Sequence, residues 1–345
     1  MRNCESLGGR ALLLLVALSL VATAAAAAEN LRFVAVGDLP YYDKDKDLPE
    51  KQRYWQHGLF TAVIAPAIRL AGVPFVIHYG DFQGGSEDCV DDLDDKRRTI
   101  MALHDGPVFY TPGDNDWTDC DRMHLKNPVS ALDRLVALRD VFFRSPLPLP
   151  PSWAYAAQRT YAENARWQRD GVLFATLHAV GSNNGREDIR IDARANALAE
   201  IEARDRANLV WLDALFAEAG RTAARAAVVA IHSDITDVPQ HAPCSDREAE
   251  QCDGYRGFRE ALTAHAAAFG KPVLLLHGST GAYCWEAAYG GVANLWRLNA
   301  AGDFRVNATV VEVAQAGVAP PFSARLLVQL GDDDDPAPKA TCRTE

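Results

Sequence analysis

Short apolar runs alternate with longer amphipathic stretches between residues 31 and 277. The runs are LRFVAV, VPFVIHY, GPVFYT, GVLFATLHAV, AAVVAI and KPVLLLH. The stretches at 50–72, 131–143, 193–220 and 255–270 place apolar residues at helical spacing. Buried strands joined by helices are typical of layered α/β proteins. The pattern therefore predicts an α/β fold, with four α/β/β/α layers as one possible arrangement.

A later group of apolar segments has no helix between its members. NLWRLNA, FRVNATVVEVA and ARLLVQL are separated only by short polar stretches. This pattern predicts antiparallel strands that close a sheet edge or form part of a second sheet. We expect one folded domain over residues 29–331. Residues 332–345 form an acidic tail, which we expect to be loose unless Cys342 pins it.

The first 28 residues have the features of a secretory signal peptide. Arg2 and Arg10 precede a long apolar run, and Ala26 and Ala28 form an A-x-A cleavage site. A membrane anchor is the alternative, but the second half of the run is almost entirely alanine. We expect a periplasmic or secreted protein that has no contact with the membrane after cleavage. The net charge of −11 argues against nucleic acid as a partner.

Six of the seven cysteines follow residue 28, an even number that suits disulfides in an oxidising compartment. They allow fifteen pairings. Cys244 with Cys252 would close a local loop, and Cys89 with Cys120 would join two loops expected side by side. Zinc binding by the thiols is the alternative, although the sequence contains no C-x-x-C pair.

Three apolar runs lead into the same dipeptide, Gly-Asp, whose aspartates are Asp38, Asp81 and Asp114. One such dipeptide usually marks only a turn. Three in succession suggest more, because ligands of α/β sheets gather at the carboxyl ends of the strands. The next runs end in His232 and His277. A histidine in such a place is often a structural residue, so that alternative stays open.

Together these five side chains form a ligand set suited to Zn, Mn or Fe. Clustered buried carboxylates repel one another unless a cation lies between them. We therefore expect a divalent metal site of one or two ions. Such a site can polarise a phosphoryl oxygen and activate water as a nucleophile.

The order and spacing of these motifs resemble the calcineurin-like metallophosphoesterases, whose relatives include the purple acid phosphatases. The resemblance covers VAVGDLPYYD, IHYGDFQGG, YTPGDNDWTDC, VVAIHSD and PVLLLHGSTGAY. It implies an α/β/β/α sandwich that holds two metals. By position, Asp38 matches the first aspartate, Asp81 the bridging one, and His232 the lone histidine. His277 matches one histidine of the last motif.

The chain departs from the family pattern at three motifs. Pro40 replaces the first histidine, and Tyr41 or Tyr42 is a candidate replacement ligand. Asp114 replaces the asparagine ligand, and Asn115 replaces the histidine that helps to protonate the leaving group. Ser279, Thr280 or Gly281 stands where a second histidine of the last motif is expected. The resemblance thus implies one metal held by Asp81, Asp114, His232 and His277, and a weaker one left with Asp38 and Asp81.

Further residues are candidates for chemistry at the same edge. Asn115 and Asp116 are the candidate catalytic residues, with His124 as an alternative acid. His178 and Asn183, in HAVGSNNG, are candidate substrate contacts, although this segment also reads as a turn. We expect a metal-dependent hydrolase of small phosphate mono- or diesters. The alternative is a non-catalytic descendant that binds a ligand or a protein.

Overall fold

The computed structural model describes residues 29–41, 55–187, 189–236, 238, 242–245, 251–331 and 335–342. The expected signal peptide, residues 1–28, lies outside this part. Within it, no helix is both long enough and apolar enough to cross a bilayer.

The strands form two mixed sheets of five and seven strands. The first has the order β12-β11-β1-β2-β3, with β12 Phe322–Leu326, β11 Thr309–Val313, β1 Leu31–Val36, β2 Val76–His78 and β3 Val108–Tyr110. The second has the order β4-β5-β6-β7-β8-β10-β9, with β4 Ala156–Ala157, β5 Ala165–Arg169, β6 Val172–Thr176, β7 Ala226–Ala230, β8 Val273–His277, β10 Leu295–Asn299 and β9 Cys284–Ala287.

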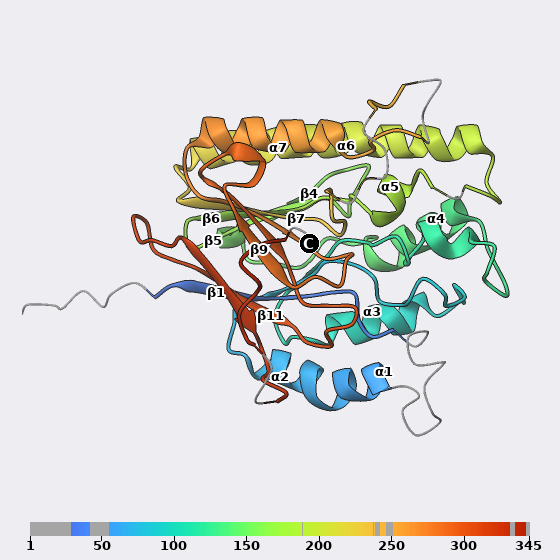
Figure 1. The fold of residues 1–345 in the computed structure, drawn as a ribbon, viewed down its shortest axis with the longest axis horizontal. Coiled ribbons are helices and arrows are strands. Elements are labelled where there is room, and N and C mark those ends of the chain that lie inside the picture. Colours follow the sequence, from blue (N-terminus) through green and yellow to red (C-terminus); the bar gives the residue numbers. More distant parts are fainter. Residues whose placement is uncertain are drawn as a thin grey trace, which may run out of the picture.

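Helices cover the outer face of each sheet, which gives the expected α/β/β/α layers (Figure 1). Two long helices cover the seven-stranded sheet, α6 Arg194–Arg221 and α7 Arg256–Phe269. The five-stranded sheet is covered by α1 Trp55–Leu59, α2 Ala65–Leu70, α3 Leu93–Met101 and α4 Ala131–Phe142. A five-residue turn, α5 Gly181–Gly185, lies at the edge between the layers.

The central core lies between the two sheets and is aromatic. Phe33, Phe75 and Phe109 of the first sheet pack on Trp167 and Phe174 of the second. The rings of Phe109 and Trp167 stack with their centroids 3.5 Å apart. Separate apolar clusters fill the space between each sheet and its helices. Strands buried on both faces explain the continuous apolar runs in the sequence.

The late strands confirm and refine the prediction from the sequence. β11 and β12 pair antiparallel and extend the first sheet next to β1. β10 instead joins the second sheet parallel to β8, with β9 antiparallel at its edge. The sequence did not reveal the β4-β5 edge.

Three disulfides are present, Cys89–Cys120, Cys244–Cys252 and Cys284–Cys342. The first two are the pairs that were singled out from the sequence. The third pins Cys342, and main-chain hydrogen bonds also attach Pro336 and Lys339 to the domain. The described part of the expected tail is therefore attached. Three disulfides suggest an extracytoplasmic protein, because disulfides form and persist in oxidising compartments.

Truncating Trp167 should test the central core. Its side chain is fully buried, so Trp167→Ala should lower the free energy of unfolding by about 3–5 kcal/mol. Val136→Ala, on an exposed side chain, should change it by less than about 0.5 kcal/mol. Guanidinium unfolding monitored by circular dichroism measures both values. Equal effects of the two substitutions would contradict this core.

Candidate metal centre

Three parallel strands of the first sheet end side by side, and the first carboxylates of the site follow these strands. Val36 of β1 lies opposite His78 of β2, which in turn lies opposite Tyr110 of β3. Asp38 and Asp81 follow at positive φ, 53° and 54°. Aspartate tolerates this left-handed conformation better than most residues, and such strain is common at functional sites.

Asp38, Asp81 and His232 form a buried cluster whose ligand atoms all lie within 4.8 Å of one another. The Nε2 atom of His232 lies 3.4 Å from Oδ2 of Asp81. It lies 2.8 Å from Oδ1 of Asp114, which joins the cluster from the third strand end. Carboxylate oxygens around one imidazole nitrogen are a donor set that Zn, Mn and Fe accept.

The orientation of His232 suits a metal ligand. Its Nδ1 atom lies 2.9 Å from the carbonyl oxygen of Tyr79, which can only accept a hydrogen bond. Nδ1 therefore carries a proton, and Nε2 faces Asp81 and Asp114, whereas the nearest oxygen of Asp38 lies 4.0 Å from Nδ1. A backbone carbonyl that fixes the ring and its tautomer is a common partner of metal-binding histidines.

Tyr41 contacts two carboxylates of the cluster. Its hydroxyl lies 3.1 Å from Oδ1 of Asp38 and 3.1 Å from Oδ2 of Asp81. Burial and both carboxylates hold the pKa of this phenol well above its usual value, so it is a hydrogen-bond donor in the absence of a cation.

Asp114 is held from outside the cluster by a strained turn. Ser182, Asn183 and Asn184 of α5 all have positive φ, near 52° to 61°. This conformation lets the Ser182 hydroxyl reach Oδ2 of Asp114 and Oδ1 of Asp119, each at 3.0 Å. Asp119 in turn forms an ion pair with Arg122 at 2.5 Å.

Close backbone approach lets the carboxylates sit this deeply. A Cβ atom on Gly113 would overlap Oδ1 of Asp81, and one on Gly278 would overlap Oδ2 of Asp38. Glycine is therefore required at both positions.

Burial and neighbouring charges shift the pKa values of the clustered side chains. Burial raises the pKa of Asp38 to about 6. Burial also raises the pKa of Asp81 well above its usual value, and the neighbouring Asp114 raises it further. Burial alone would raise the pKa of Asp114, but the hydrogen bond and charge of His232 outweigh it and lower it. For His232 the surrounding carboxylates, Asp81 foremost, overcome burial and raise the pKa. A divalent cation would relieve this repulsion, so the residues present fit one.

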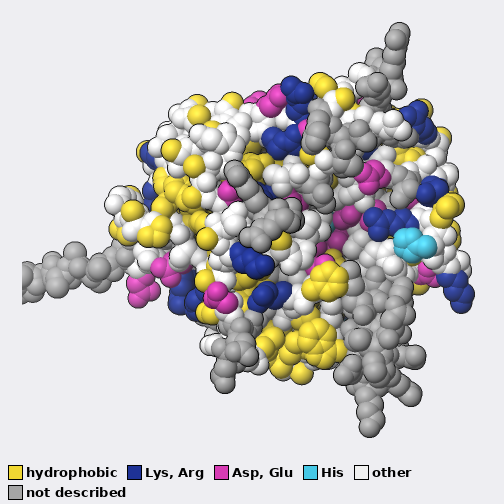
Figure 2. Space-filling view, in the orientation of Figure 1, with side chains coloured by type: hydrophobic (Ala, Val, Ile, Leu, Met, Phe, Trp, Pro, Cys, Tyr) yellow, Lys and Arg dark blue, Asp and Glu magenta, His cyan; other side chains and the backbone are white. Residues whose placement is uncertain are grey.

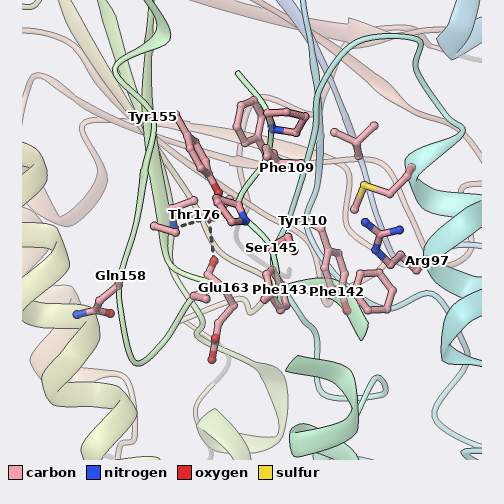
Figure 3. A pocket seen from close by; sticks show the side chains of 18 of the residues that line it. Arg97, Phe109, Tyr110, Phe142, Phe143, Ser145, Tyr155, Gln158, Glu163 and Thr176 are labelled. Carbon is pink, nitrogen blue, oxygen red and sulfur yellow. Dashed lines mark hydrogen bonds between the residues drawn. The ribbon is translucent and has the colours of Figure 1, made fainter. Parts of the chain in front are cut away.

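The cluster opens into a cavity of about 260 Å³. Its lining comprises Tyr41, Asp81, Gly85, Ser86, Asp114, Asn115, Arg122, His124, Ser279 and Asp303. A larger cavity of about 560 Å³ lies elsewhere, with walls that are mostly aromatic and aliphatic (Figure 3). We assign the chemistry to the smaller cavity because the carboxylates line it.

His277 is not among the three side chains that form the cluster. Its Nδ1 atom lies 3.0 Å from the carbonyl oxygen of Gly278. Its Nε2 atom is buried and has no hydrogen-bond partner in the described part of the chain. The residue is outside the Asp38–Asp81–His232 group. Ser279 faces the cavity instead, and its N–H donates to Oδ2 of Asp38 at 2.9 Å. The chain turns toward the site only after His277.

Asp116 does not line the cavity, where a catalytic acid would have to lie. It is fully buried and accepts hydrogen bonds from the N–H groups of Asp81, Phe82 and Gly113 and from the Tyr110 hydroxyl. Both oxygens are thus occupied in holding the two strand-end loops together. Asn115 does line the cavity, and its backbone N–H donates to Oδ1 of Asp81 at 3.0 Å.

The candidate substrate contacts are structural. His178 is fully buried, with Nδ1 2.8 Å from Glu163 and Nε2 accepting from the Trp117 indole at 3.1 Å. Asn183 donates to the carbonyl oxygen of Cys252 and accepts from the N–H of Gly254, which attaches the Cys244–Cys252 loop. Neither side chain can reach a substrate in the cavity. The turn interpretation of this segment was the better one.

Comparisons with known proteins add little on this site. No protein-family model and no curated protein sequence matches the chain. Among solved structures, the chain is similar to PhoD, with 13% sequence identity and a TM-score of 0.44 over 82% of this chain and 58% of that one. It is similar to the purple acid phosphatase PPD1 from yellow lupin (Lupinus luteus) seeds, with 11% identity and a TM-score of 0.43 over 87% of this chain and 52% of that one. The chain thus spans little more than half the length of either.

Substituting Asp116 should separate its structural role from chemistry. In Asp116→Asn one acceptor oxygen becomes an amide that faces backbone N–H groups, so unfolding should become easier by about 1–3 kcal/mol. Asp105→Asn, which removes an exposed carboxylate, should have little effect. Urea unfolding measures both. An Asp116→Asn protein of unchanged stability would argue against this scaffold.

Cation binding should depend on pH. The pKa of Asp38 is raised to about 6 and that of His232 is raised as well, so a cation must displace protons that the metal-free fold holds. Metal affinity should therefore rise with pH, by up to about tenfold per unit for each proton released. Titration calorimetry with Mn²⁺ between pH 5 and 7.5, in two buffers of different ionisation enthalpy, gives the number of protons. Constant affinity with no proton release would contradict the site.

Proposed function

We propose that this protein is a metal-dependent hydrolase of small phosphate esters that acts in the periplasm or as a secreted protein. The observation that carries the proposal is the buried Asp38–Asp81–His232 group beneath an open cavity. A cation there would be held by these three residues, with Asp114 and Tyr41 beside them. When bound, it supplies Lewis acidity toward a phosphoryl oxygen and lowers the pKa of water.

The chain's own residues define how a substrate would be received. His232, fixed through Nδ1, keeps Nε2 available for a cation. Asn115 and Ser279 place uncharged polar groups on the cavity wall. The histidine that usually helps to protonate the leaving group is absent, because Asn115 occupies its position. Esters with good leaving groups should therefore be hydrolysed fastest, whereas poor leaving groups should be slower by about 10² to 10⁴.

A non-catalytic binding protein is the second candidate. The observation that favours it is that His232 is the one imidazole among the described residues that joins the carboxylate group. Such a protein would keep the fold and the cavity and would bind a ligand or partner without turning it over.

Asp81→Asn tests the enzyme against this alternative. With added Mn²⁺ or Zn²⁺, wild type should hydrolyse p-nitrophenyl phosphate or its bis ester. The variant should lose about 10²-fold or more in kcat/KM, because it lacks the carboxylate that lies next to both Tyr41 and His232. Asp105→Asn removes an equal charge from the surface and should keep activity.

Metal analysis of the same preparations completes the test. Wild type that binds metal but hydrolyses neither ester would support the binding protein. Wild type that neither binds metal nor hydrolyses would remove the enzyme proposal altogether.

A further inference from the structure

Arg122 is the strongest positive charge on the wall of the cavity. The acidic side chains in that wall are Asp81, Asp114 and Asp303, whereas Arg122 and His124 are its basic ones. Figure 2 shows acidic side chains gathered near the middle of this face, with basic side chains and a histidine beside them. A phosphate ester entering this cavity would be repelled by the carboxylates unless the wall also offered a cationic group.

The guanidinium of Arg122 is held in place before any ligand arrives. Its Nη2 atom donates to the Ser182 hydroxyl at 3.0 Å and pairs with Asp119 at 2.5 Å. Asp119 is almost fully buried, and the side chain of Arg122 is about a quarter exposed, at 26%. A guanidinium anchored at one nitrogen presents its other N–H groups in a fixed fork, which matches phosphate oxygens.

The Nη1 atom of the Arg122 guanidinium lies toward Gly85. A Cβ atom built on Gly85 would lie 2.6 Å from Nη1 of Arg122 and 2.8 Å from Oδ1 of Asn115. Nη1 makes no hydrogen bond within the part of the chain that the structure describes. The Gly85 carbonyl oxygen lies 3.1 Å from Nε2 of His124, so this segment is itself fixed. Arg122 and Asn115 thus both approach Gly85 closely, and this approach is possible because residue 85 has no side chain.

We propose that Arg122, with Asn115 beside it, forms a subsite for the unesterified oxygens of a terminal phosphate. This inference rests on the proposed phosphoesterase function and adds a substrate class, the phosphate monoesters. A monoester carries three unesterified oxygens, so one can reach Arg122 while others face the Asp38–Asp81–His232 group. A diester has only two, and its second ester substituent occupies the third position.

Arg122 is linked to the metal-binding carboxylates only indirectly. The link runs from Nη2 to the Ser182 hydroxyl and from there to Oδ2 of Asp114. Loss of Arg122 should therefore weaken phosphate binding more than metal binding. A residue that merely held Asp114 in place would show the opposite order.

The test is phosphate binding by the mature chain loaded with Mn²⁺, measured by titration calorimetry with inorganic phosphate. Arg122→Ala should weaken phosphate binding by about ten- to a hundredfold, the effect of losing a charge-assisted hydrogen bond. Its Mn²⁺ stoichiometry should stay that of wild type. Lys126→Ala, which removes an equal charge from an exposed position nearby, should bind phosphate as wild type does.

Gly85→Ala is a second variant that keeps the net charge. Its methyl group would displace the flexible end of Arg122, so phosphate binding should weaken while the fold and Mn²⁺ binding persist. Methyl phosphate should bind wild type more tightly than dimethyl phosphate does, and this difference should shrink in both variants.

Three outcomes would overturn the inference. If Arg122→Ala binds phosphate as wild type does, while wild type hydrolyses esters, only this subsite is wrong. If Arg122→Ala loses Mn²⁺, the residue is a positioning residue for Asp114. If Mn²⁺-loaded wild type neither binds phosphate nor hydrolyses either p-nitrophenyl ester, the subsite and the proposed function fail together.

Discussion

Repulsion among buried carboxylates is the constraint on which this site depends. Asp38, Asp81 and Asp114 converge on His232 at the edge of the sheets, where little solvent can separate their charges. In the metal-free protein burial raises the pKa values of Asp38 and Asp81, and the neighbouring carboxylates raise that of Asp81 further, so these side chains hold protons more readily than exposed carboxyls do. A divalent cation bound by these side chains would replace those protons. The same arrangement therefore explains both the fit to a metal and the expected pH dependence of its binding.

Much of the fold was accessible from the sequence because its signals are local. Parallel strands buried on both faces appear as continuous apolar runs, and their carboxyl ends share one edge. Asp38, Asp81, Asp114 and His232 could be grouped on this ground, and the structure brings them together. The β4-β5 edge was missed because β4 has only two residues and β5 carries polar residues, so the apolar pattern gives no signal for either strand.

The errors at the site arose where partners far apart in the sequence decide the outcome. His277 ends β8, and only the turn that follows it brings Ser279 to the cavity. His178 is occupied by Glu163 and Trp117, and Asn183 by the loop around Cys252. The sequence near these residues gives no indication of such distant partners. Tyr41 lies three positions after Asp38, and its hydroxyl contacts both Asp38 and Asp81, so its place beside the cluster agrees with the sequence.

The residues at this edge of the sheets fall into two sets with different roles. Asp116 and Ser182 hold the loops from behind through hydrogen bonds to backbone and side chains, whereas Tyr41, Asn115, Arg122 and Ser279 face the cavity. The first set positions the strand ends whatever the second set contains. A change in the second set would therefore alter the groups that the cavity presents, whereas a change in the first set would disturb the strand ends themselves.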